Sequence, residues 1–326
     1  MGYLAGDIGG TKTHLAFFIE ENGELVCLYE SKFPSQKYLN LRSIVSQFLK
    51  EKNIKILRAC FGIAGPVKEG KSQATNLPWL VDSVGLEQDL GIDKVSLIND
   101  LEANAYGLKM LSPHEFYVIN PGDPKAEGNQ AIVSAGTGLG EAGIYYDGKN
   151  HYPFACEGGH TDFAPRNRRE DRLLTYLRKR FDHVSYERIL SGPGLYNLYQ
   201  FMVETQEVVE KEETYREIAH GDAPRLISEK GLIGSSLACR ETLELFVSIY
   251  GSEAGNVALK LFSTGGIFIG GGIAPKILDA LRGGSFLRSF IRKGRFSNLL
   301  ENVPIKVILN ERTALLGAAY YARERM

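Results

Sequence analysis

The pattern of apolar and polar positions in the first hundred residues predicts a strand-rich segment that later alternates with helices. In residues 41–49, apolar side chains recur at 41, 44, 45, 48 and 49, which is helical spacing. The turn-rich residues 65–77 favour a hairpin. The remaining elements predicted here are strands at 3–8, 13–19, 25–33, 56–64 and 95–98 and helices at 86–90 and 101–110.

A second segment begins near residue 111 and becomes mostly helical from Asp171. Its longest predicted element is an amphipathic helix over 241–262. Residues 204–231 carry many charges with little periodicity, which indicates a solvated face or a connector. The other predicted elements are strands at 116–119, 130–135, 143–146, 266–269 and 305–309 and helices at 275–281 and 314–323. We expect a small α/β domain of residues 1–110 plus 301–326 and a large α/β domain of residues 111–300.

Composition narrows the classes of function. The 326 residues are 44% hydrophobic and 24% charged, which is typical of a globular protein. With 38 basic and 39 acidic residues the net charge is −1, so we expect neither nucleic acid nor membrane as a partner. No apolar run approaches the roughly 18 residues that span a bilayer. The start of the sequence does not resemble a signal peptide, and the four cysteines are widely spaced, so we expect a reducing cytoplasm.

The segment from Val95 to Ala105 is the strongest candidate for chemistry. An apolar strand runs directly into Asn99-Asp100, and a helical pattern follows. This places a carboxylate at the end of a strand and at a helix N-terminus, where an acid or base can face a ligand.

Two glycine-rich turns are candidate phosphate sites. The first is Gly6-Asp7-Ile8-Gly9-Gly10-Thr11, and the second is Gly136-Thr137-Gly138-Leu139-Gly140. Glycines let successive backbone N–H groups converge on an anion, and Asp7 could hold Mg²⁺ through water. An ordinary hairpin turn explains Gly9-Gly10 equally well. A phosphate site together with a carboxylate suggests phosphoryl transfer to a hydroxyl.

A third glycine-rich run, Gly270-Gly271-Gly272, ends a strand before a helix. It offers a flat backbone surface for a purine and ribose, or else allows close strand–helix packing. The two phosphate turns also echo each other faintly, since both end an apolar strand; such turns are common between strands.

Two motif matches fail on context. Residues 65–72 fit the pattern G-x-x-x-x-G-K-S, but Gln73 to Pro78 resists the helix that a P-loop needs. Residues 138–143 fit G-x-G-x-x-G, but a strand and turn follow instead of a helix.

Residues 157–162 form a polar, glycine-rich stretch. Glu157 and His160 suit the directed hydrogen bonds that a polyol requires, although His160 could also be a satisfied structural histidine. Cys156 and His160 alone do not make a zinc site. Glu187 follows the candidate N-cap Ser185 and could equally be a surface glutamate that stabilises a helix dipole.

Together these elements resemble the bacterial glucokinases of the non-repressor group, in the hexokinase/actin-like ATPase superfamily. The resemblance covers nearly the whole chain. It rests on GDIGGT at 6–11, GIAGPV at 62–67, TNLPW at 75–79, IND at 98–100, GTGLG at 136–140, EGGHTDFAP at 157–165, ERILSGPGL at 187–195, GGIFIGGGIAP at 265–275 and ALLGAA at 314–319.

The resemblance implies an α/β, two-domain actin-like ATPase (ribonuclease H-like) fold with a cleft between a small and a large domain. It implies a cytoplasmic homodimer that uses ATP and Mg²⁺ to convert D-glucose into glucose 6-phosphate, the first step of glycolysis. Asp100 is the implied catalytic base, and no residue binds the metal directly, since Mg²⁺ is carried by the ATP phosphates. The implied glucose contacts are Asn99, Asp100, Gly138, Glu157, His160 and Glu187. The implied ATP contacts are Gly6, Asp7, Ile8, Gly9, Gly10, Thr11, Gly136, Thr137, Gly270, Gly271 and Gly272.

Departures from the family pattern fall at residues 309–313 and 204–231, away from the implied site. The cysteine cluster of the zinc-binding repressor relatives is missing from the sequence. Three alternatives remain: a kinase for another hexose such as mannose or fructose, a non-catalytic sugar-sensing protein of the same fold, and a P-loop enzyme that depends on Lys71. The sensor is expected to carry a helix-turn-helix, a pattern not found before Tyr3.

Overall fold

The computed structural model describes residues 1–50, 52, 54–74 and 77–326, and these divide into two compact units. Unit 1 comprises residues 1–113 and 310–326, and unit 2 comprises residues 114–309. Residues 301–309, which the sequence-based division placed with the small domain, lie in unit 2. Thr75 and Asn76 of the TNLPW motif lie outside the described residues.

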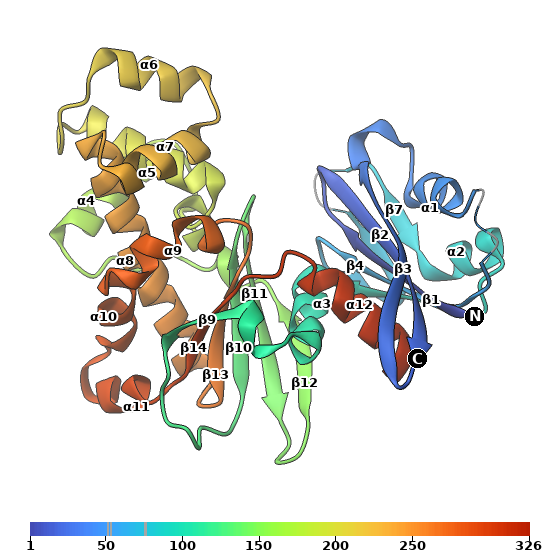
Figure 1. Ribbon diagram of the computed structural model, residues 1–326. Helices are drawn as coiled ribbons and strands as arrows, with labels where there is room; N and C mark the ends of the chain where they lie inside the picture. The colour runs from blue at the N-terminus through green and yellow to red at the C-terminus, as the bar shows by residue number, and fades with distance from the viewer. Residues whose placement is uncertain (51, 53, 75–76) are drawn as a thin grey trace. The chain divides into compact units, whose positions relative to one another are not determined.

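Unit 1 is built on a five-stranded sheet (Figure 1). Its order is β3 (Glu24–Pro34), β2 (Lys12–Glu21), β1 (Gly2–Ile8), β4 (Ile56–Ile63) and β8 (Val95–Asn99). The first three strands are antiparallel, whereas β1, β4 and β8 are parallel. The two faces bury different side chains because alternate residues of a strand point to opposite faces. Leu4 and Phe61 pack with α1 (Leu41–Leu49) and α2 (Ser83–Leu90), while Ala5 and Cys60 pack with α3 (Asp100–Gly107) and α12 (Thr313–Glu324).

The segment that matches a P-loop forms part of a small three-stranded sheet. Its strands are β5 (Val67–Lys68), β6 (Lys71–Gln73) and β7 (Leu80–Asp82). Glu69 and Gly70 form the hairpin tip and have positive φ angles of 52° and 73°. Lys71 and Ser72 lie in a strand, so the helix that a P-loop requires is not there and the P-loop alternative is wrong.

Unit 2 contains a six-stranded sheet. Its order is β12 (His151–Cys156), β11 (Leu139–Tyr146), β10 (Gln130–Ala135), β13 (Gly266–Gly270), β14 (Ile305–Ile308) and β9 (Phe116–Asn120). Strands β10, β11 and β12 form an antiparallel meander, and β13 and β14 continue it in parallel with β10. Strand β9 is antiparallel to β14. This arrangement repeats that of the sheet in unit 1, and it extends the faint echo between the two glycine turns to whole sheets.

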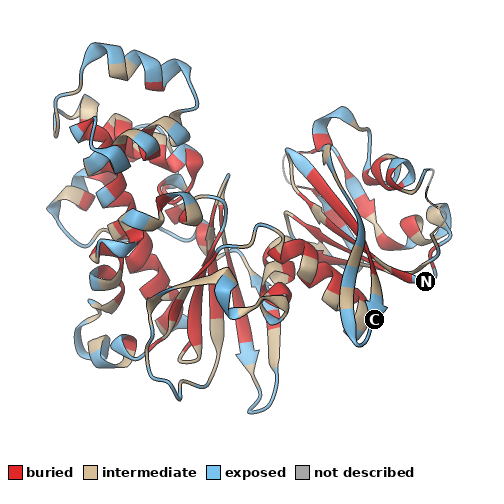
Figure 2. Cartoon of the chain, in the orientation of Figure 1, coloured by how far each residue is buried: buried red, intermediate tan, exposed pale blue. Residues whose placement is uncertain are grey.

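The helices of unit 2 lie mainly between β12 and β13. They are α4 (Arg168–Leu177), α5 (Gly192–Glu204), α6 (Glu212–His220), α7 (Ala223–Ile233) and α8 (Leu237–Lys260), followed after β13 by α9 (Leu278–Arg282), α10 (Ser285–Ile291) and α11 (Ser297–Glu301). Helix α8 was expected to be amphipathic, but it is buried along most of its length (Figure 2). In the described part of the chain, no helix combines the length and the apolar character needed to cross a membrane.

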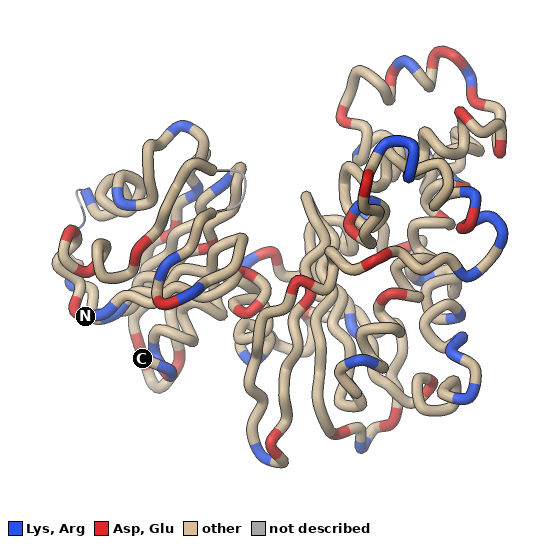
Figure 3. The backbone as a smooth tube through the Cα atoms, turned by 180° about the vertical axis from the view of Figure 1, so that it is seen from behind, with Lys and Arg blue, Asp and Glu red and all other residues tan. Residues whose placement is uncertain are grey.

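Two further expectations need correction. The connector expected at 204–231 contains α6 and α7, whose apolar Ile218 and Ile227 are buried. Charged side chains of both signs lie along these helices (Figure 3), and some of them pair, as Lys230 and Glu217 do at 2.9 Å. The many charges make the helical spacing of the apolar residues hard to recognise in the sequence. Strand β11 begins at Leu139 rather than at 143. Glycines 140 and 143 interrupt the alternation that marks a strand in the sequence, and Gly143 has a packing reason, since a Cβ there would approach the Phe154 ring to 2.1 Å.

Candidate active site

In unit 1, the predicted phosphate turn and the Asn99-Asp100 pair lie at the same edge of the sheet. Strands β1, β4 and β8 are parallel, with Ile8 opposite Ile63 and Ile63 opposite Asn99. Gly62 on β4 lies between the two elements: a Cβ there would be 3.7 Å from the Gly6 carbonyl oxygen and 3.7 Å from the Asp100 Cα. Ligands of α/β sheets gather at such carboxyl ends.

The Gly9-Gly10 turn joins β1 to β2 as a hairpin. The Gly9 N–H donates to the Lys12 carbonyl at 2.9 Å, and Ile8 pairs with Thr13. Ser35 fixes this turn from outside: its hydroxyl donates to the Gly9 carbonyl at 2.7 Å, and its N–H donates to the Thr11 carbonyl at 3.0 Å. The backbone at Gly9-Gly10 therefore forms the hairpin turn that the sequence offered as an alternative. The Thr11 side chain is exposed beside the glycines. Sequence reasoning missed Ser35, which carries no motif signal.

Asp7 is the carboxylate nearest to this turn in the chain. It lies on β1 opposite His14, and burial raises its pKa to about 6. A nearby cation would offset the cost of burying its charge, and a single carboxylate with water molecules is a common way of holding Mg²⁺. Among the described residues, no group of three or more His, Cys, Asp or Glu side chains is placed to hold a metal ion. Asp7 therefore suits an ion that takes most of its ligands from groups other than protein side chains.

Asn99 and Asp100 are placed by the start of α3. The Asn99 side-chain oxygen accepts from the N–H groups of Leu101 at 2.9 Å and Glu102 at 3.3 Å, and its amide donates to the Gly65 carbonyl at 3.1 Å. These bonds give Asn99 a structural task and leave one amide N–H for a ligand. Asp100 is the first residue of the helix, where the dipole stabilises a negative charge, and its carboxylate also accepts from the Leu101 N–H at 3.0 Å.

In unit 2, the second phosphate turn lies beside the glycine run that follows β13. A Cβ on Gly136 would be 4.0 Å from the Gly272 nitrogen. Gly271 has a φ of +82°, and a Cβ there would be 2.1 Å from the Ala135 carbonyl oxygen. Gly271 therefore packs closely against strand β10, a contact between strands and not the strand–helix packing that the sequence suggested, whereas a Cβ on Gly272 would have no neighbour within 4 Å. Thr137 is exposed at the tip of the turn.

Three of the predicted sugar contacts come together in unit 2. The Glu187 carboxylate accepts from the Leu139 N–H at 3.0 Å, and its Oε2 lies 4.0 Å from His160 Nε2. A Cβ on Gly138 would be 2.4 Å from the same oxygen, so only glycine fits there. Glu157 begins the same turn as His160, and its carbonyl accepts from the His160 N–H at 3.1 Å.

Main-chain bonds hold the turn η4 (Gly158–His160) against the turn η5 (Tyr186–Arg188). The Tyr186 N–H donates to the Thr161 carbonyl at 3.1 Å, and the Phe163 N–H donates to the Val184 carbonyl at 2.9 Å. The rings of Phe163 and Tyr186 meet edge to face at 5.6 Å. Tyr186 and Phe163 thus set the spacing of His160 and Glu187, a role that no sequence pattern indicated.

The chain is similar to known proteins along nearly its whole length. A family model described as Glucokinase matches residues 4–325. A glucokinase of Trichormus variabilis is 41% identical over 98% of each chain. The crystal structure of a glucokinase from an Antarctic psychrotroph is 33% identical, covers 98% of each chain and has a TM-score of 0.85. A ROK family glucokinase from Streptomyces griseus, solved with glucose and AMPPNP, shares the fold at 20% identity, with a TM-score of 0.68 over 99% of this chain and 100% of that one.

Proposed function

The chain belongs to the glucokinase family, and on this premise we propose which of its residues transfer the γ-phosphoryl group of ATP to the 6-hydroxyl of D-glucose. The predictions of an ATP-dependent glucose kinase and of the actin-like ATPase fold are confirmed. The observation that carries the assignment of residues is the placement of Asp100 in unit 1, at the sheet edge that also carries the Gly6–Thr11 turn.

Asp100 is proposed as the catalytic base. Its carboxylate orients the 6-hydroxyl and accepts the proton as the new P–O bond forms. Phosphoryl transfer has a loose transition state, so positioning of the hydroxyl contributes more than its early deprotonation. As the first residue of α3, Asp100 lies at the positive end of the helix dipole.

The sugar is proposed to be bound by Glu157, His160 and Glu187, with Gly138 allowing close approach and Asn99 contributing its remaining N–H. Charged carboxylates accept strong hydrogen bonds from sugar hydroxyls, whereas His160 can donate or accept. Glu187 is already oriented by the Leu139 N–H, so it loses little conformational freedom when a sugar binds.

ATP is proposed to bind along the glycine-rich backbone. The turns at Gly6–Thr11 and Gly136–Gly140 offer N–H groups to phosphate oxygens, and Gly270–Gly272 offers the open surface for adenosine. Mg²⁺ would be held by the phosphates and, through water, by Asp7; when bound it neutralises charge on the phosphates. A cytoplasmic location and a homodimer are further proposals, which the family resemblance supports; light scattering on the purified chain tests the second.

The direct test is a coupled assay for glucose 6-phosphate with ATP, Mg²⁺ and the purified chain. We expect product that depends on glucose and on ATP. Mannose, fructose and polyphosphate in place of glucose or ATP form the comparison set. Faster turnover of another hexose would replace glucose in the proposal, and no turnover of any hexose by the folded protein would overturn it.

A further inference from the structure

Three carboxylates of unit 2 are almost fully withdrawn from water, and they differ in their partners. Glu141 on β11 is 3% exposed, and Glu170 and Glu253 are 0% exposed. A buried carboxylate is costly unless charged or hydrogen-bonding groups compensate it. The partners of each carboxyl group therefore indicate how the cost of its burial is offset.

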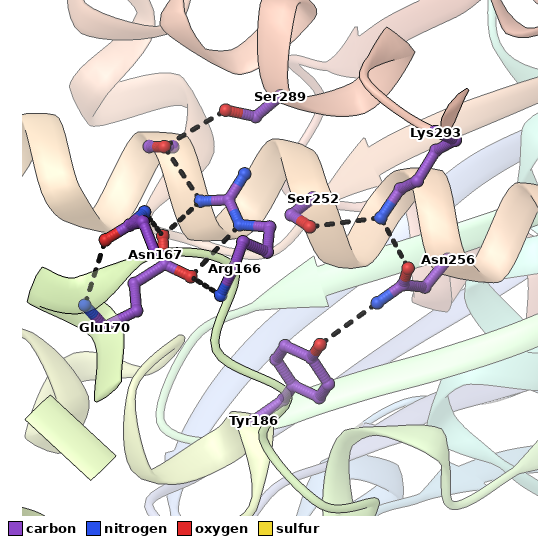
Figure 4. Close-up of polar contacts among 9 residues, drawn as sticks. Arg166, Asn167, Glu170, Tyr186, Ser252, Asn256, Ser289 and Lys293 are labelled. Carbon is purple, nitrogen blue, oxygen red and sulfur yellow. Dashed lines mark hydrogen bonds and ion pairs between the residues drawn. The ribbon is translucent and has the colours of Figure 1, made fainter. Parts of the chain in front are cut away.

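Glu170 and Glu253 are compensated (Figure 4 shows Glu170 and the neighbours of Glu253). Glu170 accepts from the guanidinium of Arg166 at 2.5 Å and from the side chain of Asn167 at 2.9 Å. Glu253 accepts from the Asn256 amide at 2.7 Å, and its other oxygen lies 3.5 Å from Lys260 Nζ. Arg166 and Asn167 thus satisfy the buried carboxyl group of Glu170, whereas burial raises the pKa of Glu253 although Asn256 and Lys260 oppose the rise.

Asn256 links Glu253 to the sugar-binding turns. The same amide group donates to the Tyr186 hydroxyl at 3.0 Å, and Lys293 Nζ donates to the Asn256 carbonyl at 2.5 Å and to Ser252 at 3.1 Å (Figure 4). Tyr186 directly precedes Glu187. The polar groups along α8 therefore reach the back of the turn η5.

Glu141 is different. Among the described residues, Glu141 Oε1 and Glu253 Oε1 are both buried without a hydrogen-bond partner, but Glu253 Oε1 has Lys260 Nζ at 3.5 Å. Burial raises the pKa of Glu141 to about 8, and the negative charge of Glu253 acts in the same direction, while Lys260 opposes both. At neutral pH the uncharged carboxylic acid is therefore the favoured form of this side chain.

The Glu141 carboxyl group lies directly beneath the turn that carries two predicted sugar contacts. A Cβ on Gly158 would be 1.9 Å from Glu141 Oε2 and 2.8 Å from its Cδ. The next residue, Gly159, lies equally close to β11, since a Cβ there would be 2.0 Å from the Leu139 carbonyl oxygen. Nothing separates the carboxyl group from the backbone that joins Glu157 to His160.

We propose that Glu141 is a positioning residue for glucose binding, which in its uncharged form supports Gly158 and so fixes the height of the Glu157–His160 turn. Ionisation of Glu141 would bury a negative charge near Glu253 and draw water beneath the turn. This would displace Glu157 and His160 from their positions. The proposal rests on the proposed function, since it concerns the same sugar site.

The titratable groups that face Glu141 come from two sides. Helix α8 contributes Tyr250, Glu253 and Lys260, and β12 contributes Cys156, which itself interacts with Glu157. Lys293 does not touch Glu141, but burial lowers its pKa to about 8, so it titrates in the same range. A variant must therefore separate Glu141 from Lys293.

Glu141→Gln makes this separation because the amide has the shape of the uncharged acid and cannot ionise. We expect the glucose KM of the natural protein to rise about tenfold between pH 7 and pH 9, as the uncharged form is lost. The KM for ATP should not follow this rise. Glu141→Gln should keep a low glucose KM over the whole range, and Glu244→Gln, at an exposed position of α8, should behave as the natural protein. A glucose KM of Glu141→Gln that rises in parallel with that of the natural protein would overturn the proposal.

A steric test uses the contact itself. Gly158→Ala should raise the glucose KM about tenfold or more, because the new methyl group displaces the turn. Adding Glu141→Ala removes the carboxyl group and leaves the Glu141 Cβ 3.4 Å from the new methyl, so the double variant should recover most of the affinity. No recovery in a folded double variant contradicts the proposal.

Hydrogen exchange gives a readout that does not depend on turnover. We expect the amides of residues 158–161 to lose protection above pH 8 in the natural protein and to keep it in Glu141→Gln. Equal protection in both proteins would overturn the positioning role even if the kinase is active. Conversely, a pH-dependent turn without glucose phosphorylation would overturn the proposed function and leave this contact standing.

Discussion

The sheets of the two units share one strand plan but differ in the chain that connects their strands. In both, a three-stranded meander is continued by two parallel strands. The connection from β3 to β4 in unit 1 spans residues 35–55 and contains α1, whereas that from β12 to β13 in unit 2 spans 157–265 and contains α4 to α8. The turns with Glu157, His160 and Glu187 lie in the longer connection. The comparison teaches that, in the proposed assignment, the repeated sheets supply the two glycine-rich turns and Asp100, while the insertion supplies Glu157, His160 and Glu187.

The two phosphate turns differ in the charge around them. The turn of unit 1 contains Asp7 and is followed by Lys12, while residues 136–140 of unit 2 carry no charged side chain. Two carboxyl groups lie near the second turn: Glu141, which follows it in β11, and Glu187, which comes from the insertion. We therefore expect substitutions in unit 1 to affect phosphoryl transfer most and substitutions in the insertion to affect sugar affinity most.

The largest expected effect is that of Asp100→Ala in unit 1. We expect kcat to fall about 10³-fold or more, because the variant lacks the proton acceptor, while ATP affinity stays nearly unchanged. Steady-state kinetics with calorimetric titration of ATP measures both. Glu102→Gln, in the first turn of the same helix, is the matched control and should stay active. Strong residual turnover of Asp100→Ala would contradict the proposal that Asp100 is the catalytic base.

In the insertion, Glu187→Gln should raise the glucose KM by about ten- to a hundredfold with a smaller effect on kcat. A hydrogen bond to a charged group contributes about 1.5–3 kcal/mol, and the amide oxygen still accepts from Leu139. Glu204→Gln alters a surface carboxylate that binds Arg180 and serves as control. An unchanged glucose KM would show that Glu187 has only its structural bond.

The glycine surface of unit 2 is tested by comparing Gly271→Ala with Gly148→Ala. Both glycines have positive φ angles, +82° and +93°, so both variants pay a backbone cost of about 1–3 kcal/mol. Only Gly271 approaches another strand, with a Cβ 2.1 Å from the Ala135 carbonyl oxygen, whereas a Cβ on Gly148 has no neighbour within 4 Å. We expect Gly271→Ala to raise the ATP KM several-fold and Gly148→Ala to leave it unchanged. Equal ATP KM values in the two variants would contradict the proposal that residues 270–272 bind the nucleotide.

The smallest expected effect concerns stability and pH. The folded protein holds the Glu141 proton up to about pH 8, whereas the unfolded chain releases it near the ordinary value of 4.5. The folded state thus binds more protons in this window, and the free energy of unfolding falls as pH rises, by at most about 1.4 kcal/mol per pH unit. Urea unfolding of the natural protein and of Glu141→Gln at pH 6 and pH 8 measures the difference. We expect the natural protein to lose more stability than the variant, and parallel losses would contradict the raised pKa.

Local patterns predicted much of the fold but only part of the site. The position of Asp100 followed from the sequence because a strand that runs into a helix is a local signal within residues 95–105. The meeting of Gly138, His160 and Glu187 depends on pairing between distant segments, which periodicity does not encode. Glu141 was hidden because glycines 140 and 143 interrupt the alternation of β11, and Tyr186 and Ser35 act through contacts that no motif marks.

The most direct test of the division between sheet and insertion is a comparison of hexose selectivity in two variants. The ratio of kcat/KM for glucose to that for mannose is measured for the natural protein, Asp100→Asn and Glu187→Gln. The account predicts that Asp100→Asn lowers both values by a similar factor and keeps the ratio, whereas Glu187→Gln changes the ratio. A ratio that changes in Asp100→Asn and stays constant in Glu187→Gln would contradict it.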